Sequence, residues 1–280
     1  MLSYRHGFHA GNHADVLKHI VLMRILDHVV KKDKPFCCVD THAGAGTYLL
    51  TGEYAQKTRE FETGIAKLWG RDDLPDAVDR YVSAVKALNT TEALRVYPGS
   101  PVFERHFLRD RDRLFLFELH STEIELLKAF AHRDKRIKVV HGDGLSECIG
   151  LFPPDERRGV ALLDPSYEIK TDYRQVVETL AMLYRRFATG TYAIWYPVIE
   201  RHRVNQLERA VKRSGVRKVH RYELGIRADA QGHGMTASGM IVVNPPWTLD
   251  GEMKDILPYL ARTLGEDGKG FHRTDVLAGE

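Results

Sequence analysis

The chain has 280 residues, of which 43% are hydrophobic and 28% are charged, and its formal net charge is +3. This length suits one large α/β domain with a small embellishment. No run approaches the roughly eighteen apolar residues of a membrane helix, and residues 1–15 lack the apolar core of a signal peptide. The three cysteines, Cys37, Cys38 and Cys148, have neither zinc nor disulfide spacing. We therefore expect a cytoplasmic protein without a membrane partner.

The hydrophobic pattern alternates between helical and strand-like segments. Residues 13–31 predict an amphipathic helix, and residues 35–40 predict a short strand. Such alternation predicts a parallel, doubly wound sheet covered on both faces. From Gly265 the chain is polar and carries glycines, so we expect a loose end. The other predicted strands are 114–119, 137–140, 160–163, 192–196 and 240–243, and helices are predicted at 122–131 and 172–187.

The first predicted strand leads into the loop Asp40-Thr41-His42-Ala43-Gly44-Ala45-Gly46. Glycines at such a turn let the backbone approach a nucleotide-like ligand closely. The dinucleotide fingerprint needs a further glycine or alanine where this chain has Leu49, which disfavours a nicotinamide dehydrogenase. An acidic residue for ribose hydroxyls is expected about 20 residues after the loop, but the best candidate, Glu118, follows Gly46 by 72 residues.

This long gap predicts an insertion before the core helix that should follow the loop. The inserted residues are polar and predict two helices, at 59–69 and 75–88. The core resumes at Gly99, where Ser100 is a candidate N-cap and Pro101 a candidate first helical residue. Ser100 would then lie at the mouth of the site. The predicted division is a core of residues 1–49 and 96–280 and an inserted helical subdomain of residues 50–95.

Polar residues follow successive predicted strands. Glu118 ends one strand, Gly142-Asp143-Gly144 follows the next, and Asp164 ends the strand at 160–163. Ligands of open α/β sheets bind outside the carboxyl ends of the strands. Together with the glycine loop, this order predicts one shared site.

Asp164 is followed by Pro165-Ser166-Tyr167. The carboxylate and the proline carbonyl can both accept hydrogen bonds from one exocyclic amine, and an aromatic ring can stack on the base that carries it. Two acceptors on one amine orient its lone pair toward an electrophile, which suits methyl transfer. A strand that simply ends in an Asp-Pro turn is the alternative interpretation.

These features resemble the class I S-adenosylmethionine-dependent methyltransferases that act on amines, whose signature is Asp/Asn-Pro-Pro-Tyr/Phe. Longer blocks, which extend the likeness through nearly the whole chain, are similar to the bacterial RlmJ family. The resemblance implies a Rossmann-like sheet, mostly parallel with its last strand antiparallel. It further implies a monomer that methylates N6 of an adenine in 23S ribosomal RNA, either free or in an early assembly particle. The blocks are Tyr4-Arg5-His6, residues 8–19, residues 40–46, residues 97–101 and residues 235–240.

The resemblance also implies roles for individual residues. Asp164 would be the catalytic residue, and Tyr4, His6 and Tyr167 would contact the RNA. Ser166 replaces the second proline of the signature, which we expect to preserve activity but to hold Tyr167 less rigidly. The residues expected to bind S-adenosylmethionine are Lys18, His19, His42, Ser100, Glu118, Asp143, Gly144 and Asp164.

The histidines at positions 6, 9, 13 and 19 could also suggest a metal site. Because no cysteine accompanies them, we favour ligand contacts or hydrogen bonds and expect no metal.

A rival motif, Asn244-Pro245-Pro246-Trp247, matches the amine-methyltransferase signature better than the segment at Asp164 does. It follows the last predicted strand, however, whereas Asp164 comes directly after the series of cofactor residues. Position therefore favours Asp164 as the catalytic residue.

The segment from Arg201 to Arg221 carries eight Arg or Lys residues against one acid, Glu208, for a formal local charge of +7. We expect it to contact RNA phosphates together with the N-terminal block, which comprises Tyr4-Arg5-His6 and residues 8–19. A solvated helix face is the alternative.

Two other functions remain open from the sequence. A DNA adenine-N6 methyltransferase would share the chemistry, but it usually carries a recognition region between its cofactor and catalytic motifs. Only a short connection separates Asp143 from Asp164. A catalytically silent RNA-binding module would bind RNA without binding the cofactor.

Overall fold

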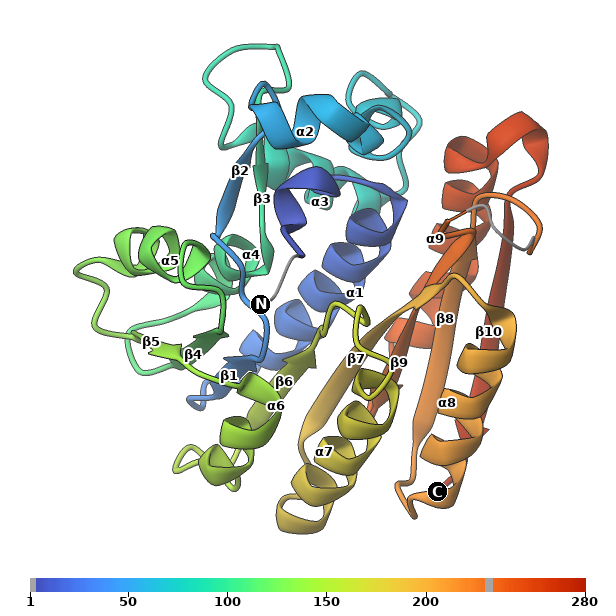
Figure 1. The fold of residues 1–280 in the computed structure, drawn as a ribbon. Helices are drawn as coiled ribbons and strands as arrows, with labels where there is room; N and C mark the ends of the chain where they lie inside the picture. The colour runs from blue at the N-terminus through green and yellow to red at the C-terminus, as the bar shows by residue number, and fades with distance from the viewer. Residues whose placement is uncertain (1–3, 230–233) are drawn as a thin grey trace.

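The computed structural model (Figure 1) describes residues 4–229 and 234–280. Its centre is an eight-stranded sheet in the order β10-β8-β9-β7-β6-β1-β4-β5. Strands β5, β4, β1, β6 and β7 are parallel, whereas β9 is antiparallel to both β7 and β8. The strands are β1 (Cys37–Asp40), β4 (Arg113–Glu118), β5 (Ile137–His141), β6 (Gly159–Leu163), β7 (Thr191–Val198), β8 (Val219–Gly225), β9 (Ala237–Val243) and β10 (Phe271–Ala278).

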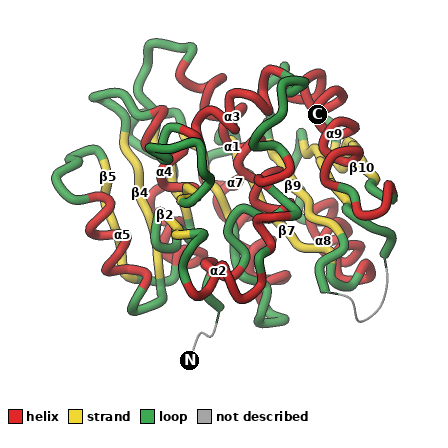
Figure 2. Tube along the Cα trace, turned by 90° about the horizontal axis from the view of Figure 1, so that it is seen from above, coloured by secondary structure: helices red, strands yellow, loops and turns green. Residues whose placement is uncertain are grey.

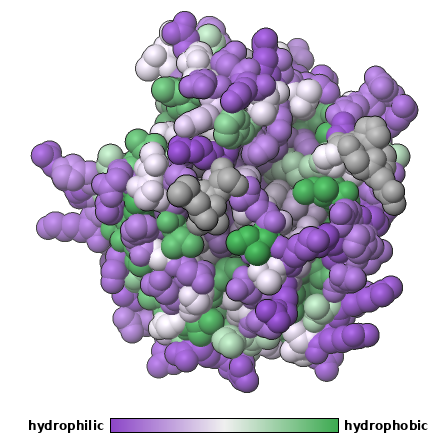
Figure 3. Space-filling model, viewed as in Figure 1, coloured by the Kyte–Doolittle hydropathy of each residue, from purple (hydrophilic) through white to green (hydrophobic). Residues whose placement is uncertain are grey.

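Both faces of this sheet are covered, as the sequence predicts. In β1, Cys38 packs into one apolar cluster, and its neighbours Cys37 and Val39 pack into the other. Because successive strand residues point to opposite faces, a fully apolar strand such as β6 also needs cover on both sides. Helices lie on both sides of the strand layer (Figure 2), and the outer surface seen in Figure 3 is mostly hydrophilic.

The helices divide between the two clusters. α1 (His13–Val30), α3 (Asp76–Lys86), α4 (Ser100–Phe107), α5 (Glu123–Ala131) and α9 (Leu249–Leu264) contribute to the first. α6 (Gly144–Glu147), α7 (Asp172–Arg186) and α8 (Arg201–Arg213) contribute to the second. α1 begins where the Asn12 side chain accepts hydrogen bonds from the backbone N–H groups of Ala14 and Asp15, both at 3.0 Å.

The predicted insertion is enclosed by a two-stranded antiparallel ribbon of β2 (Thr47–Leu49) and β3 (Val96–Pro98). The helix predicted at 75–88 is confirmed as α3, but the helix predicted at 59–69 is wrong. That region holds the end of α2 (Glu53–Thr58) and two 3₁₀ turns, Glu60–Glu62 and Ile65–Lys67.

Two residues interrupt the helix predicted there. Arg59 has φ of 52°, in the left-handed region, and ends α2. A Cβ at Gly64 would lie 2.1 Å from the carbonyl oxygen of Gly11, so only glycine allows this contact with the N-terminal block. Whether residues 50–95 form a separate subdomain stays a prediction, since α3 packs into the same apolar cluster as α1.

The loose end expected after Gly265 is also wrong, because Phe271–Ala278 forms β10 beside β8. β10 lies at the sheet edge and exposes most of its residues, so it lacks the apolar pattern of a central strand. The neighbouring strand β8 escaped prediction because Arg221 interrupts it. Arg221 is buried there between the carboxylates of Glu208 and Asp275.

Candidate active site

A cavity of about 770 Å³ opens at the carboxyl ends of the parallel strands. Its walls come from the N-terminal block, from the loop after β1, and from residues after β4, β5, β6 and β7. The predicted site residues that line it are Tyr4, His6, Lys18, His19, His42, Ser100, Glu118, Asp143, Gly144 and Asp164.

The loop after β1 is held by two carboxylates. Asp40, which is fully buried, accepts hydrogen bonds from the backbone N–H of His42 at 3.0 Å and from the hydroxyl of Ser100 at 2.6 Å. Gly99, not Ser100, is the N-cap of α4, so the Ser100 hydroxyl orders the loop rather than capping the helix. Glu118 accepts from the backbone N–H of Gly44 at 2.9 Å.

Glycine is required at two turns of this site. Gly44 has φ of +62°, and a Cβ there would lie 2.1 Å from the Tyr48 hydroxyl. Gly144 packs so closely that a Cβ would lie 2.1 Å from the carbonyl oxygen of Thr41. The contact of Gly144 with Thr41 brings the loops after β1 and β5 against each other at the cavity wall, where Asp143 caps α6 through the N–H of Leu145.

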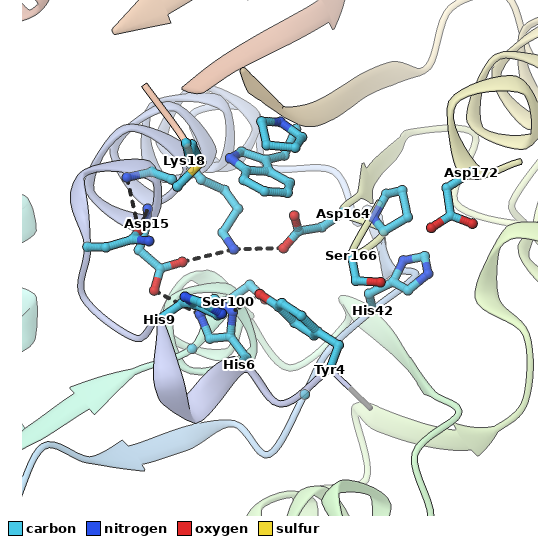
Figure 4. A pocket seen from close by; sticks show the side chains of 18 of the residues that line it. Tyr4, His6, His9, Asp15, Lys18, His42, Ser100, Asp164, Ser166 and Asp172 are labelled. Atoms are coloured by element: carbon cyan, nitrogen blue, oxygen red, sulfur yellow. Dashed lines mark hydrogen bonds and ion pairs between the residues drawn. The ribbon is translucent and has the colours of Figure 1, made fainter. Parts of the chain in front are cut away.

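A continuous chain of hydrogen bonds and ion pairs runs through the part of the cavity around Lys18 and Asp164 (Figure 4). The Nζ atom of Lys18 lies 2.7 Å from Oδ2 of Asp164 and 3.0 Å from Oδ1 of Asp15. The second oxygen of Asp15 bonds Nε2 of His6 at 2.8 Å, and Nδ1 of His6 bonds the Tyr4 hydroxyl at 3.0 Å. One chain therefore joins the N-terminal block, α1 and the end of β6.

The electrostatics of this chain follow from its burial. Burial raises the pKa of Asp164, while the charge of Lys18 and its hydrogen bond act in the opposite direction. For Lys18, burial opposes the charge, but Asp15 and Asp164 outweigh it and raise the pKa. Burial also acts against the Asp15 carboxylate, yet His6 and Lys18 hold its pKa well below the ordinary value. The ammonium of Lys18 thus favours the ionised form of both carboxyl groups.

Other titratable groups around the cavity are shifted mainly by burial. Burial raises the pKa of Asp40 to about 7 and lowers the pKa values of His42 and His13 to about 4 each. Burial likewise lowers the pKa of His19 well below its usual value. The side chains of His13, His19 and His42 therefore line the cavity as neutral imidazoles at neutral pH.

Tyr167 does not reach the cavity. Its side chain is buried, its hydroxyl donates to the carbonyl oxygen of Trp195 at 2.6 Å, and its ring centroid lies 4.5 Å from that of Tyr173. It is absent from the cavity lining, which includes Pro165 and Ser166. The structure thus places Tyr167 in the core, contrary to the expectation that it stacks on a substrate base.

Two residues of the site escaped the sequence analysis. Asp15 joins His6 to Lys18, but in the sequence it is typical of an acid that favours the first turn of a helix. Trp195 lines the cavity, and the Nζ atom of Lys18 lies 5.8 Å from the centroid of its ring. In the sequence Trp195 is one more apolar residue of a strand, so no local signal marks it.

The rival motif lies on the side of the sheet where the parallel strands begin, opposite the cavity. Because β9 is antiparallel, Val243 pairs with Tyr192 near the start of β7, and Asn244 follows from there. The Asn244 side chain donates to the carbonyl oxygens of Ala188 and Gly190, at 2.8 and 2.7 Å. Its role is structural, which agrees with the choice of Asp164 made from position alone.

The basic segment from Arg201 to Arg221 is only partly available for phosphates. Arg201 pairs with Glu223 and Asp229, and Arg221 is buried between two acids. Exposed cations such as Arg213 and Arg217 lie where α8 ends and β8 begins, at the sheet edge away from the cavity. Phosphate contacts from this segment beside the target base are therefore not supported.

The strand order, with β9 antiparallel between β7 and β8, and a cavity at the carboxyl ends of the parallel strands define a class I methyltransferase fold. A sequence model of the family described as "Ribosomal RNA large subunit methyltransferase D, RlmJ" matches residues 33–277. The chain belongs to this family.

Individual relatives agree with this assignment. Proteins named "Ribosomal RNA large subunit methyltransferase J" from Escherichia coli (strain K12) and from Haemophilus influenzae are each 48% identical to this chain, over 96% of it and 96% of their own lengths. The crystal structure of protein LPL1258 from Legionella pneumophila has a TM-score of 0.89 and 38% identity, covering 96% of this chain and 98% of that one. Among the described residues no helix is long and apolar enough to cross a membrane.

Proposed function

We propose that this protein transfers a methyl group from S-adenosylmethionine to the N6 amine of an adenine in 23S ribosomal RNA. The observation that carries the proposal is the Lys18–Asp164 pair, 2.7 Å apart, in the same cavity as the glycine loop. Family membership supports ribosomal RNA as the substrate class. DNA methylation and silent RNA binding have no comparable support.

Several residues that line the cavity near the glycine loop and α1 fit the cofactor. Glu118 faces the cavity with a carboxylate that can accept from ribose hydroxyls, as acidic residues do after this loop. His19 lines the same cavity, and its buried Nε2 atom has no hydrogen-bond partner among the described residues. A buried polar atom without a partner is costly, so a ligand there would satisfy it. S-adenosylmethionine, when bound, supplies an electrophilic methyl group.

The part of the cavity around Asp164 would hold the target amine. Oδ2 of Asp164 is engaged by Lys18, which leaves Oδ1 and the Pro165 carbonyl to accept the two N–H groups of N6. An adenine must leave its stack to reach this point. Trp195 lies on the cavity wall near Lys18, and Tyr4, which also lines the cavity, lies at the far end of the polar chain. Either ring would take the stacking role expected of Tyr167.

This arrangement acts mainly by positioning. Two acceptors fix the amine so that its lone pair, rather than an N–H, faces the methyl donor, and positioning can contribute about 7–11 kcal/mol to a barrier. That lone pair would form the new N–C bond while the bond between the methyl carbon and the cofactor's sulfur breaks and the sulfur keeps its electron pair, and the amine would then carry one proton too many. Asp164 can accept this proton, because burial raises its pKa above that of an exposed carboxylate.

The test is transfer of labelled methyl groups to deproteinised 23S rRNA, followed by mass mapping of the digested product. We expect one labelled fragment that contains N6-methyladenosine. Label in duplex DNA instead would favour the DNA enzyme. RNA binding without any transfer or cofactor binding would favour the silent module.

A further inference from the structure

The sheet edge opposite the cavity is strongly basic. Six connections lead into the amino ends of β1, β4, β5, β6, β7 and β8, which the strand registers place level with one another. They hold twelve Lys or Arg against six Asp or Glu, a formal charge of +6, although the whole chain has only +3. We call them the basic edge: residues 31–36, 108–112, 132–136, 152–158, 187–190 and 214–218.

The connections at the carboxyl ends of the same strands have the opposite sign. Residues 41–46, 119–122, 142–143, 164–171, 199–200, 226–229 and 234–236 hold two basic and five acidic residues, a formal charge of −3. This is the edge that carries the cavity. A polyanion therefore meets repulsion from the strand-end loops around the cavity and attraction at the basic edge, since exposed charges act over roughly 8–10 Å at ordinary salt.

Many of the cations on the basic edge have no acidic partner. Arg109, Arg111 and Arg136 form ion pairs with neighbouring acids. Within the described part of the chain, six exposed basic side chains of the edge form no ion pair: Lys32, Lys34, Arg133, Lys135, Arg157 and Arg217. Such cations are available to neutralise phosphates and release their counterions.

The rival motif supplies an aromatic ring at the same edge. Trp247 is 84% exposed, although it follows two prolines in a well-fixed turn. Asn244 adopts φ of 50° there and donates its backbone N–H to the carbonyl oxygen of Lys218 at 2.9 Å. The turn is thus tied to the connection that carries Arg217. A turn that presents an exposed indole and is bonded to the connection carrying Arg217 is suited to contact with a stacked partner.

We propose that the basic edge, with Trp247, is a second RNA-contacting surface that binds a segment of the substrate RNA remote from the target adenine. Positive charge combined with an exposed aromatic ring is the pattern of sequence-tolerant RNA binding, in which bases stack on the ring and cations track the backbone. The inference rests on the proposed function, because it takes ribosomal RNA as the ligand. A folded RNA can reach both edges of one protein, which a single nucleotide in the cavity cannot do.

The experiment compares two RNAs, full-length deproteinised 23S rRNA and a short stem-loop around the mapped adenine. Trp247→Ala and Arg217→Glu should each weaken binding of the long RNA on the order of ten-fold, and Arg217→Glu should reduce the slope of log affinity against log salt by about 1. Both should leave cofactor affinity and the rate of transfer to the stem-loop unchanged. Leu126→Ala, which removes a 53% exposed side chain on α5, is the control for Trp247→Ala, and Lys128→Glu is the control for Arg217→Glu. Neither control should change the affinity for the long RNA or the rate of transfer to the stem-loop.

Equal affinity of wild type and variants for the long RNA would overturn the inference. So would equal weakening on the stem-loop, since the surface would then act near the cavity. Loss of self-association in Trp247→Ala, measured by analytical ultracentrifugation with RNA affinity unchanged, would assign the surface to a second copy of the chain and overturn it as well. Failure of the wild type to methylate either RNA would instead contradict the proposed function, and RNA affinity would still report on the edge.

Discussion

Lys18 and Asp164 are 146 residues apart in the chain, yet the Nζ atom of one lies 2.7 Å from Oδ2 of the other. Lys18 is 4% exposed and also touches Asp15, so a single ammonium serves two buried carboxyl groups. This pair links α1, which carries the N-terminal block, to the residue that would hold the amine. In the proposed methyl transfer, the position of α1 therefore affects how Asp164 holds the amine.

Replacing Lys18 with Met should impair both stability and transfer. The variant leaves two buried carboxyl groups without their cation, and breaking a buried pair costs about 3–5 kcal/mol. We expect the free energy of unfolding, measured with urea, to fall by about that amount, and transfer to fall with it. Lys32→Met, at an exposed site, should change stability by no more than about 0.5 kcal/mol. Full transfer activity in Lys18→Met would show that Asp164 needs no cation.

Asp164→Asn should separate catalysis from cofactor binding. The amide keeps the shape but loses the charge that accepts from the amine, and removal of one such interaction lowers kcat by roughly 10²–10³-fold. Asp164 is also among the residues expected to bind the cofactor, but the amide keeps one acceptor oxygen, so cofactor affinity, measured by calorimetry, should fall far less than kcat. Asn244→Ala should mostly spare transfer, although it removes the hydrogen bonds to Ala188 and Gly190. The reverse result would move the catalytic role to the rival motif.

Asp40→Asn should alter how stability depends on pH. Burial raises the pKa of Asp40 to about 7, above the unfolded value of about 3.9. The folded state therefore binds more protons between these values, so this group's contribution to stability is present below about pH 4 and is lost as pH rises to about 7. The free energy of unfolding of the variant minus that of wild type should increase across this window.

His42→Gln provides a control of opposite sign. Burial lowers the pKa of His42 to about 4, so the unfolded state binds more protons between about pH 4 and its unfolded pKa of about 6.5. In wild type the His42 contribution makes stability rise with pH in this window. Removing it should make the difference from wild type fall. Difference curves of the same sign for both variants would contradict these assignments.

Tyr167→Phe tests the buried position of Tyr167. The change removes one hydroxyl that donates to Trp195, which should lower the free energy of unfolding by about 1 kcal/mol. Because the ring stays in the core, KM for RNA should remain unchanged. A large rise in KM with unchanged stability would show that Tyr167 contacts the base after all.

Much of the fold could be predicted because its strands are buried on both faces and are therefore apolar throughout. β6 is of this kind, and so is β1 apart from Asp40 at its end. β8 and β10 were missed because tertiary ion pairs, such as Arg221 with Asp275, make polar residues acceptable in them. The false helix at 59–69 has a similar cause, since a contact between Gly64 and Gly11 ends a pattern that looks helical in isolation.

The sequence by itself determined the order of the site residues along the strands, and hence the cavity edge, because parallel strands bring their carboxyl ends together. The sequence also favoured Asp164 over Asn244 as the catalytic residue. Only the tertiary structure decided which side chains meet there. It brought Asp15 between His6 and Lys18, put Trp195 on the cavity wall, and buried Tyr167 beneath it. The positions of these strands along the chain follow from local pattern, whereas the direction of each side chain depends on packing between segments far apart in the chain.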